Sequence, residues 1–204
     1  MRHVAVLIAF LSAPLIAPTS SPAVTLNFEG LSDLEPVAEF YNGGLGGDHG
    51  ISFSPNMFAL IDSDQGGSGL FANEPSADTV LTYSGASAVI NVPVGFTSVE
   101  FYFAGSTTPN HLVEEYSGLD GTGQLLSQSG LASGGYSSSG DPTGQEYGVW
   151  LYHQDLTDTV ARSVVFSGDG QLLLDDFEIV LVPEPSTALF VGLGLVALAG
   201  CRRG

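Results

Sequence analysis

The chain has 204 residues, of which 22 are acidic and only 4 are basic, and its formal net charge is −18 at pH 7. Nucleic acid is excluded as a partner, because neutralising phosphates requires clustered Lys and Arg side chains, and Arg162 is the only one between residues 24 and 181. The length favours a single domain between two processing segments, and the 44% of hydrophobic residues suffices for its core.

Residues 1–23 have the pattern of a secretory signal peptide. A positively charged start precedes an apolar run over residues 4–16, and Ser21-Pro22-Ala23 is an acceptable cleavage site. We therefore expect signal peptidase to remove this segment during export.

Residues 24–181 predict an all-β domain. Turn-forming residues recur about every 8–12 positions, which is typical of a β-sandwich, and no apolar helical period is sustained. The clearest alternation places Val99, Phe101 and Phe103 on a buried face and Glu100 and Tyr102 on an exposed one. Short strands in two antiparallel sheets indicate a jelly-roll-like antiparallel β-sandwich. The expected strands are 25–28, 50–53, 57–61, 79–83, 88–92, 98–104, 112–116, 124–127, 147–152, 161–167 and 172–181.

Two late apolar runs predict a β-hairpin. Residues 163–166 and 172–180 are separated by Gly168-Asp169-Gly170, a sequence that favours a tight turn. We therefore expect these two strands to be neighbours in one sheet.

Acidic residues in the first and last strands are candidate metal ligands, because Ca²⁺ prefers six to eight carboxylate and carbonyl oxygens. Glu29 follows the first expected strand, and one of the adjacent Asp175 and Asp176 must point inward, where an unpaired charge is costly. The pattern resembles carbohydrate-binding jelly rolls, which hold a structural calcium between an early Glu and a late Asp. The resemblance implies that Glu29 and either Asp175 or Asp176 bind Ca²⁺. The alternative is an aspartate that is hydrogen-bonded to backbone.

Aromatic side chains are candidates for sugar binding, because exposed rings stack on pyranose faces. Trp150 and Tyr152 share one face of the expected strand 147–152, while Val149 and Leu151 share the other, so one pair must face outward. The sequence therefore predicts carbohydrate binding by Trp150 and Tyr152, with a core position for Trp150 as the alternative. Further tyrosines could contribute, namely Tyr102, Tyr116, Tyr136 and Tyr147.

Catalytic motifs are lacking from the sequence. There is no Gly-x-Ser-x-Gly elbow, no His-Glu-x-x-His and no phosphate-binding glycine loop. Glu114 and Glu115 point to opposite faces of a strand and cannot act together as a glycosidase pair. We therefore expect a protein that is not an enzyme, with a secreted glycan hydrolase as the less favoured alternative. Scattered histidines are more typical of surface or core positions than of a site: His49, His111 and His153.

Residues 182–204 form a third segment with three parts in fixed order. Its prolines keep the first part extended and accessible to an enzyme. Residues 188–200 carry no charge and are expected to form a short membrane-spanning hydrophobic helix, followed by arginines that stay cytoplasmic. The residues of the motif are Val182, Pro183, Glu184, Pro185, Ser186, Thr187, Arg202 and Arg203.

This segment resembles the PEP-CTERM sorting signal of Gram-negative bacteria, which exosortases read. The resemblance implies an exosortase as partner, membrane contact through the hydrophobic helix before processing, and transfer or release at the outer surface. It also implies an association with organisms that make extracellular polysaccharide and biofilm matrix. The sequence thus predicts an exported, non-enzymatic protein of the outer surface or extracellular matrix with affinity for exopolysaccharide. A purely structural matrix protein without a ligand is the alternative.

Overall fold

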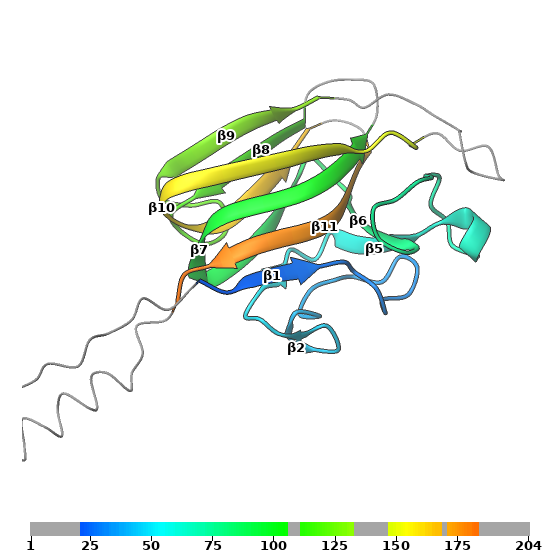
Figure 1. The fold of residues 1–204 in the computed structure, drawn as a ribbon, viewed down its shortest axis with the longest axis horizontal. Helices are drawn as coiled ribbons and strands as arrows, with labels where there is room; N and C mark the ends of the chain where they lie inside the picture. Colours follow the sequence, from blue (N-terminus) through cyan, green and yellow to red (C-terminus); the bar gives the residue numbers. More distant parts are fainter. Residues whose placement is uncertain (1–20, 106–110, 133–146, 169–170, 184–204) are drawn as a thin grey trace, which may run out of the picture.

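The computed structural model describes residues 21–105, 111–132, 147–168 and 171–183 (Figure 1). The hydrophobic helix expected over residues 188–200 and most of the expected signal peptide lie outside them. The described residues are all-β apart from one 3-10 turn, η1 (Ser63–Gln65), and none of their helices is long and apolar enough to cross a membrane. The strands are β1 (Ala23–Leu26), β2 (Asn42–Gly44), β3 (Gly47–Asp48), β4 (Ser52–Phe53), β5 (Met57–Ile61), β6 (Thr79–Tyr83), β7 (Ser87–Gly105), β8 (His111–Tyr116), β9 (Leu125–Leu131), β10 (Leu151–Ser167) and β11 (Leu172–Leu181).

Two long antiparallel strands, β7 and β10, connect the two layers of the sandwich. The strand order is β5-β6-β11-β7-β10-β8-β9, with β1 beside β11 and β4 beside β7, while β2 and β3 form a separate pair. The pairing of β10 with β7 has two irregularities, one between Leu156 and Ala161 and one between Ala161 and Ser163. Such irregularities bend a strand and increase its twist. The first half of β10 therefore lies in the layer of β11, β6 and β5, and its second half leads into the layer of β8 and β9.

The core confirms the alternation expected along β7. Val99, Phe101 and Phe103 are buried between the layers, and Tyr102 is exposed on the outer surface. The Phe101 ring stacks on Phe177 of β11, with ring centroids 4.8 Å apart and planes 8° from parallel. Phe166, in the second half of β10, meets both of these rings edge to face. Aromatic rings from both layers therefore pack into the main core, which confirms the jelly-roll-like antiparallel β-sandwich.

The expected hairpin between residues 163–166 and 172–180 is wrong. β10 and β11 are not neighbours, because β7 lies between them. Phe103 of β7 pairs with Leu151 of β10 on one side and with Leu174 of β11 on the other. A turn sequence favours a hairpin only when no third strand competes, and the 19-residue β7 offers a long edge to both strands.

The first and last strands of the domain are paired with each other. Ala23 of β1, the last residue of the expected signal segment, lies opposite Val180 of β11, and Leu26 lies opposite Phe177. The amide of Leu181 donates to the carbonyl of Pro22 over 2.9 Å. The two described chain ends therefore leave the sandwich side by side (Figure 1).

Candidate functional site: the aromatic–carboxylate face

The outer surface of β7, β10 and β11 carries a cross-strand pair of tyrosines. Tyr102 lies opposite Tyr152 in the register of β7 and β10, and their ring centroids are 5.4 Å apart at an interplanar angle of 59°. Both rings are exposed, Tyr152 by 52% and Tyr102 by 37%. Exposed aromatic pairs of this kind offer a large apolar contact at a low cost in side-chain entropy.

Polar side chains surround this pair and hold it in place. The carboxylate of Glu100 accepts hydrogen bonds from the hydroxyl of Tyr152 and from Nε2 of Gln154. The hydrogen bond to Glu100 is the main cause that raises the pKa of Tyr152 to about 12, so its hydroxyl stays a donor. We call the surface formed by Glu100, Tyr102, Tyr152, Gln154 and Glu178 the aromatic–carboxylate face.

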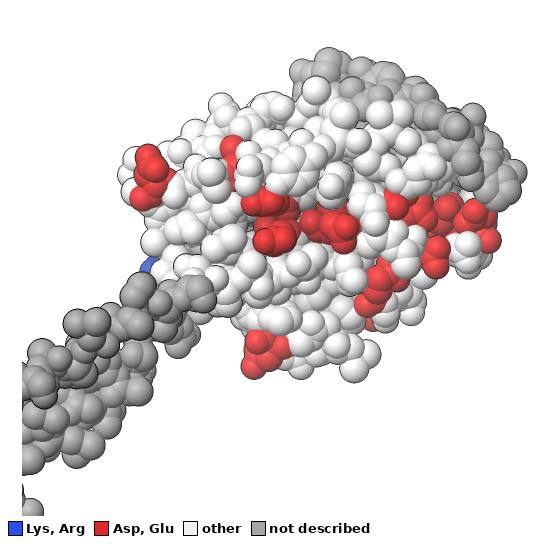
Figure 2. Space-filling view, viewed as in Figure 1, with Lys and Arg blue, Asp and Glu red and all other residues white. Residues whose placement is uncertain are grey.

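Negative charge is concentrated on this face. Glu178 of β11 lies opposite Glu100 of β7, so two carboxylates are cross-strand neighbours. Figure 2 shows acidic side chains across the middle of the surface that is formed by β7 and β11. Like charges in such positions repel each other, which disfavours an anionic ligand and favours a neutral polar one or a cation.

The structure does not bring the two expected sugar-binding aromatics together. Tyr152 lies on the exposed face, whereas Trp150 precedes β10 and is half-buried. Nε1 of Trp150 donates to the carbonyl of Ala72 over 3.0 Å, and its ring meets Phe71 edge to face at 6.5 Å. Trp150 thus anchors the segment before β6, and the aromatic neighbour of Tyr152 is Tyr102.

Two of the expected calcium ligands, Glu29 in the turn after β1 and Asp175 in β11, hold the segment that leads into β6. Oε1 of Glu29 accepts from the amides of Asp78 and Thr79, each over 3.1 Å. The buried carboxylate of Asp175 accepts from the amide of Ser76 over 2.8 Å and from its hydroxyl over 2.7 Å. These contacts are those of the alternative, in which an aspartate is hydrogen-bonded to backbone.

A calcium ligand set is not evident from these contacts. Asp176, half-buried, has a left-handed φ of 46° at the bulge between Asp175 and Glu178. In the part of the chain that the structure describes, no three His, Cys, Asp or Glu side chains are grouped so that they could hold a metal ion. Calcium binding stays a prediction.

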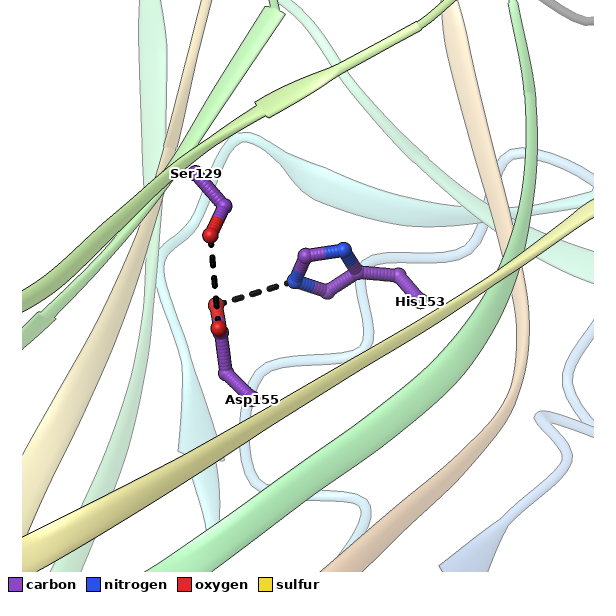
Figure 3. Close-up of polar contacts among 3 residues, drawn as sticks. All are labelled: Ser129, His153 and Asp155. Atoms are coloured by element: carbon purple, nitrogen blue, oxygen red, sulfur yellow. Dashed lines mark hydrogen bonds and ion pairs between the residues drawn. The ribbon is translucent and has the colours of Figure 1, made fainter.

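A second polar cluster lies between the layers, where the inner side of β10 faces β9 (Figure 3). The carboxylate of Asp155 is central: its Oδ1 accepts from the hydroxyl of Ser129 over 3.3 Å, and its Oδ2 lies 2.9 Å from Nε2 of His153. The hydroxyl reaches the carboxylate and not the imidazole. The three residues therefore do not form the Ser–His–Asp relay of a hydrolase, in which the imidazole lies between the other two groups.

Glu115 of β8 adds a buried carboxyl group near this cluster. It is completely buried, and neither of its side-chain oxygens has a hydrogen-bond partner among the described residues. Burial, and then the charge of Asp155, raise its pKa to about 7. Glu114, its neighbour in sequence, faces outward and accepts from Nε2 of Gln128. The opposite orientations of the two glutamates were expected from the sequence.

The sequence did not indicate the inner cluster, because residues 153–160 were not expected to form a strand. His153 and Asp155 alternate with Tyr152 and Gln154, so the first half of β10 is polar on both faces. An apolar alternation, which usually reveals a strand, is missing there. Nor was the long partner of this strand expected, because the sequence predicted two strands, 88–92 and 98–104, where the structure has the single strand β7.

Comparisons with known proteins identify the last segment and the fold. Residues 181–203 match the family model of the PEP-CTERM protein-sorting motif. No curated protein matches the chain in sequence. The K2 cleaved adhesin domain of Lys-gingipain is similar in structure, with a TM-score of 0.51, 14% identity, and coverage of 78% of this chain and 99% of that chain. At this identity the likeness concerns the fold alone.

Carbohydrate-binding modules give lower TM-scores. A family 6 carbohydrate-binding module has a TM-score of 0.41 at 13% identity and covers 78% of this chain and 94% of that chain. CsCBM6-3 from Clostridium stercorarium, in complex with cellobiose, also has a TM-score of 0.41, at 14% identity, and covers 82% of this chain and 100% of that chain. The chain thus carries a β-sandwich followed by a PEP-CTERM protein-sorting motif, and it is an exported, surface-associated protein that is processed by an exosortase at a membrane.

Proposed function

We propose that the β-sandwich is a non-enzymatic module that retains the protein on neutral exopolysaccharide, at the outer surface or in the extracellular matrix of a Gram-negative bacterium. The observation that carries this proposal is the exposed pair of Tyr102 and Tyr152, with Glu100 and Gln154 beside it. Sugar rings combine an apolar face with hydroxyl groups at their edges. The tyrosine rings supply the apolar contact, and the carboxylate and amide accept or donate the hydrogen bonds.

The charge of the domain supports a neutral glycan over an acidic one. Arg162 is the only Lys or Arg in the described residues, and the net charge of the chain is −18. A uronic-acid polymer would meet the carboxylates of Glu100 and Glu178 without a compensating cation. We therefore expect binding to neutral glucans or xylans and none to alginate.

Burial raises the pKa of Glu74 and Glu115 to about 7 and that of Asp175 to about 6, and none of these carboxyl groups belongs to the aromatic–carboxylate face, which does not favour hydrolysis there. A glycosidase needs a general acid with a raised pKa that touches the glycosidic oxygen. Glu115 has a pKa of about 7, but its side chain is completely buried and cannot contact a polymer. The carboxylate of Glu100 lies on the face but is already engaged by Tyr152 and Gln154.

Affinity electrophoresis through gels that contain a neutral β-glucan, xylan or alginate tests the proposal. We expect retardation by a neutral glycan, reduced about tenfold in affinity in Tyr152→Ala, since one aromatic contact is worth about 1.5 kcal/mol. Tyr116→Ala is the matched control, because Tyr116 lies on β8 in the other layer. Absence of retardation by every glycan, or equal retardation of the two variants, would contradict binding through this face.

A structural matrix protein that self-associates is the second candidate, and β9 favours it. This strand ends the path of the nine-stranded sheet and contains no charged residue and no proline. Natural sheet edges commonly use such residues to prevent pairing with another chain. Analytical ultracentrifugation tests this function: self-association that is lost in Gln128→Lys, without any glycan affinity, would favour it over the binding module.

A further inference from the structure

The chain is held to the sandwich up to the residue before the sorting motif's first proline. Leu181 of β11 pairs with Phe96 of β7, and the amide of Val182 donates to the carbonyl of Gly95 over 2.9 Å. On the other side of β11, the amide of Leu181 donates to the carbonyl of Pro22. The domain therefore has no flexible linker of its own before Pro183.

The surface around this exit is mainly apolar. A groove of about 280 Å³ has an apolar lining from Pro22, Val24, Val94, Leu181, Val182 and Pro183, and its polar members are Asp48 and His49. The side chain of Val160, 39% exposed, lies against Gly95 beside it. We call the surface formed by Pro22, Val94, Val160 and Val182 the exit end.

The sequence leaves little distance between the exit end and the expected membrane segment. Only residues 184–187 separate Pro183 from the uncharged residues 188–200. Four residues span at most about 13 Å when fully extended. Because each headgroup layer of a bilayer is about 5–8 Å thick, the domain can stand no more than about 8 Å from the lipid surface.

We propose that the exit end lies on the lipid surface of the membrane for as long as the sorting segment is anchored there. This inference rests on the membrane-spanning helix that the sequence predicts over residues 188–200. Electrostatic attraction does not bring the domain to the membrane, since Arg162 is its only Lys or Arg and it has no cationic patch for anionic lipid. The contact follows instead from the shortness of residues 184–187. The second half of β7, the first half of β10, and β11 carry the aromatic–carboxylate face and extend away from the exit end, so this face points sideways and stays open to polysaccharide before processing (Figure 1).

The orientation is tested with the full chain in vesicles of phosphatidylcholine that contain a headgroup-region spin label as quencher. A Cys201→Ser background removes the single cysteine, and an environment-sensitive fluorophore is attached at Val160→Cys. The matched control is Leu70→Cys, which is also exposed, by 45%, and follows η1 at the far side of the sandwich. We expect several-fold stronger quenching at position 160 than at position 70.

A second variant tests whether the short connection between the domain and residues 188–200 causes the contact with lipid. Inserting a Gly/Ser linker of about 20 residues after Thr187 adds an average span of about 25 Å. Quenching at position 160 should then fall to the level of position 70. Equal quenching at both positions in the parent chain, or no effect of the linker, would overturn the orientation alone. A chain that does not float with the vesicles would overturn the anchoring, and the orientation with it.

Discussion

The two faces of the first half of β10 carry similar residues in opposite surroundings. On the outer face, Tyr152 and Gln154 share the solvent-exposed carboxylate of Glu100. On the inner face, His153 and Asp155 lie 14–15% exposed beside Ser129, near the buried Glu115. The outer carboxylates are in contact with water, whereas the buried Glu115 is not, so the same chemical group is accessible to a ligand on one face and costs stability on the other.

The largest expected effect concerns the inner face. A carboxyl group whose pKa is raised in the folded state costs no stability below its unfolded pKa of about 4.5, and stability is lost as the pH rises toward the folded pKa of about 7. Glu115→Gln should therefore leave the free energy of unfolding nearly unchanged at pH 4. At pH 8 it should raise it by up to about 3 kcal/mol. Urea denaturation at the two pH values measures the difference.

Glu114→Gln is the control for this prediction, because Glu114 precedes Glu115 on the same strand but faces outward. We expect a change within about 0.5 kcal/mol at both pH values, as for most surface substitutions. If Glu115→Gln has the same small effect at pH 8 as at pH 4, the inner carboxyl is hydrated and the contrast between the faces is lost.

The next effect concerns a buried carboxyl group that, unlike Glu115, has partners. Asp175 receives the amide and the hydroxyl of Ser76. Asp175→Ala leaves that amide without its acceptor, and we expect a loss of about 1–3 kcal/mol of unfolding free energy. Ser76→Ala removes only the hydroxyl and should cost less, about 1 kcal/mol. Chemical denaturation ranks the two variants, and the reverse order would show that the backbone contact does not hold the loop.

Removal of calcium tests a second role for Asp175, since the sequence predicts that Glu29 and either Asp175 or Asp176 bind Ca²⁺. If the ion binds there, its removal with EDTA lowers the melting temperature, because a ligand that binds only the folded state stabilises it. Glu29→Gln should abolish this dependence on calcium. A melting temperature that EDTA leaves unchanged assigns both carboxylates to the loop contacts alone.

Much of the fold could be predicted where one strand face is apolar. The inward residues of β7 were expected, and β5 and β6, which are largely buried, begin and end at the expected residues. The pairing of β7 with both β10 and β11 could not be predicted, because register across the sheet depends on which long strands compete for one edge. For the same reason Tyr152 was identified as a candidate, but its neighbour Tyr102, 50 positions earlier in the chain, was not assigned to it.

The smallest effect tests the outer face. Tyr152→Phe keeps the ring but removes the hydroxyl that donates to Glu100. Since the ring is half exposed, the free energy of unfolding should change by no more than about 0.5 kcal/mol. Spectrophotometric titration should lose one tyrosine with a pKa of about 12. Glycan affinity should fall less in Tyr152→Phe than in Tyr152→Ala, because the stacking surface remains and only its orientation by Glu100 is lost. Equal losses in the two variants would assign recognition to the hydroxyl and not to the ring.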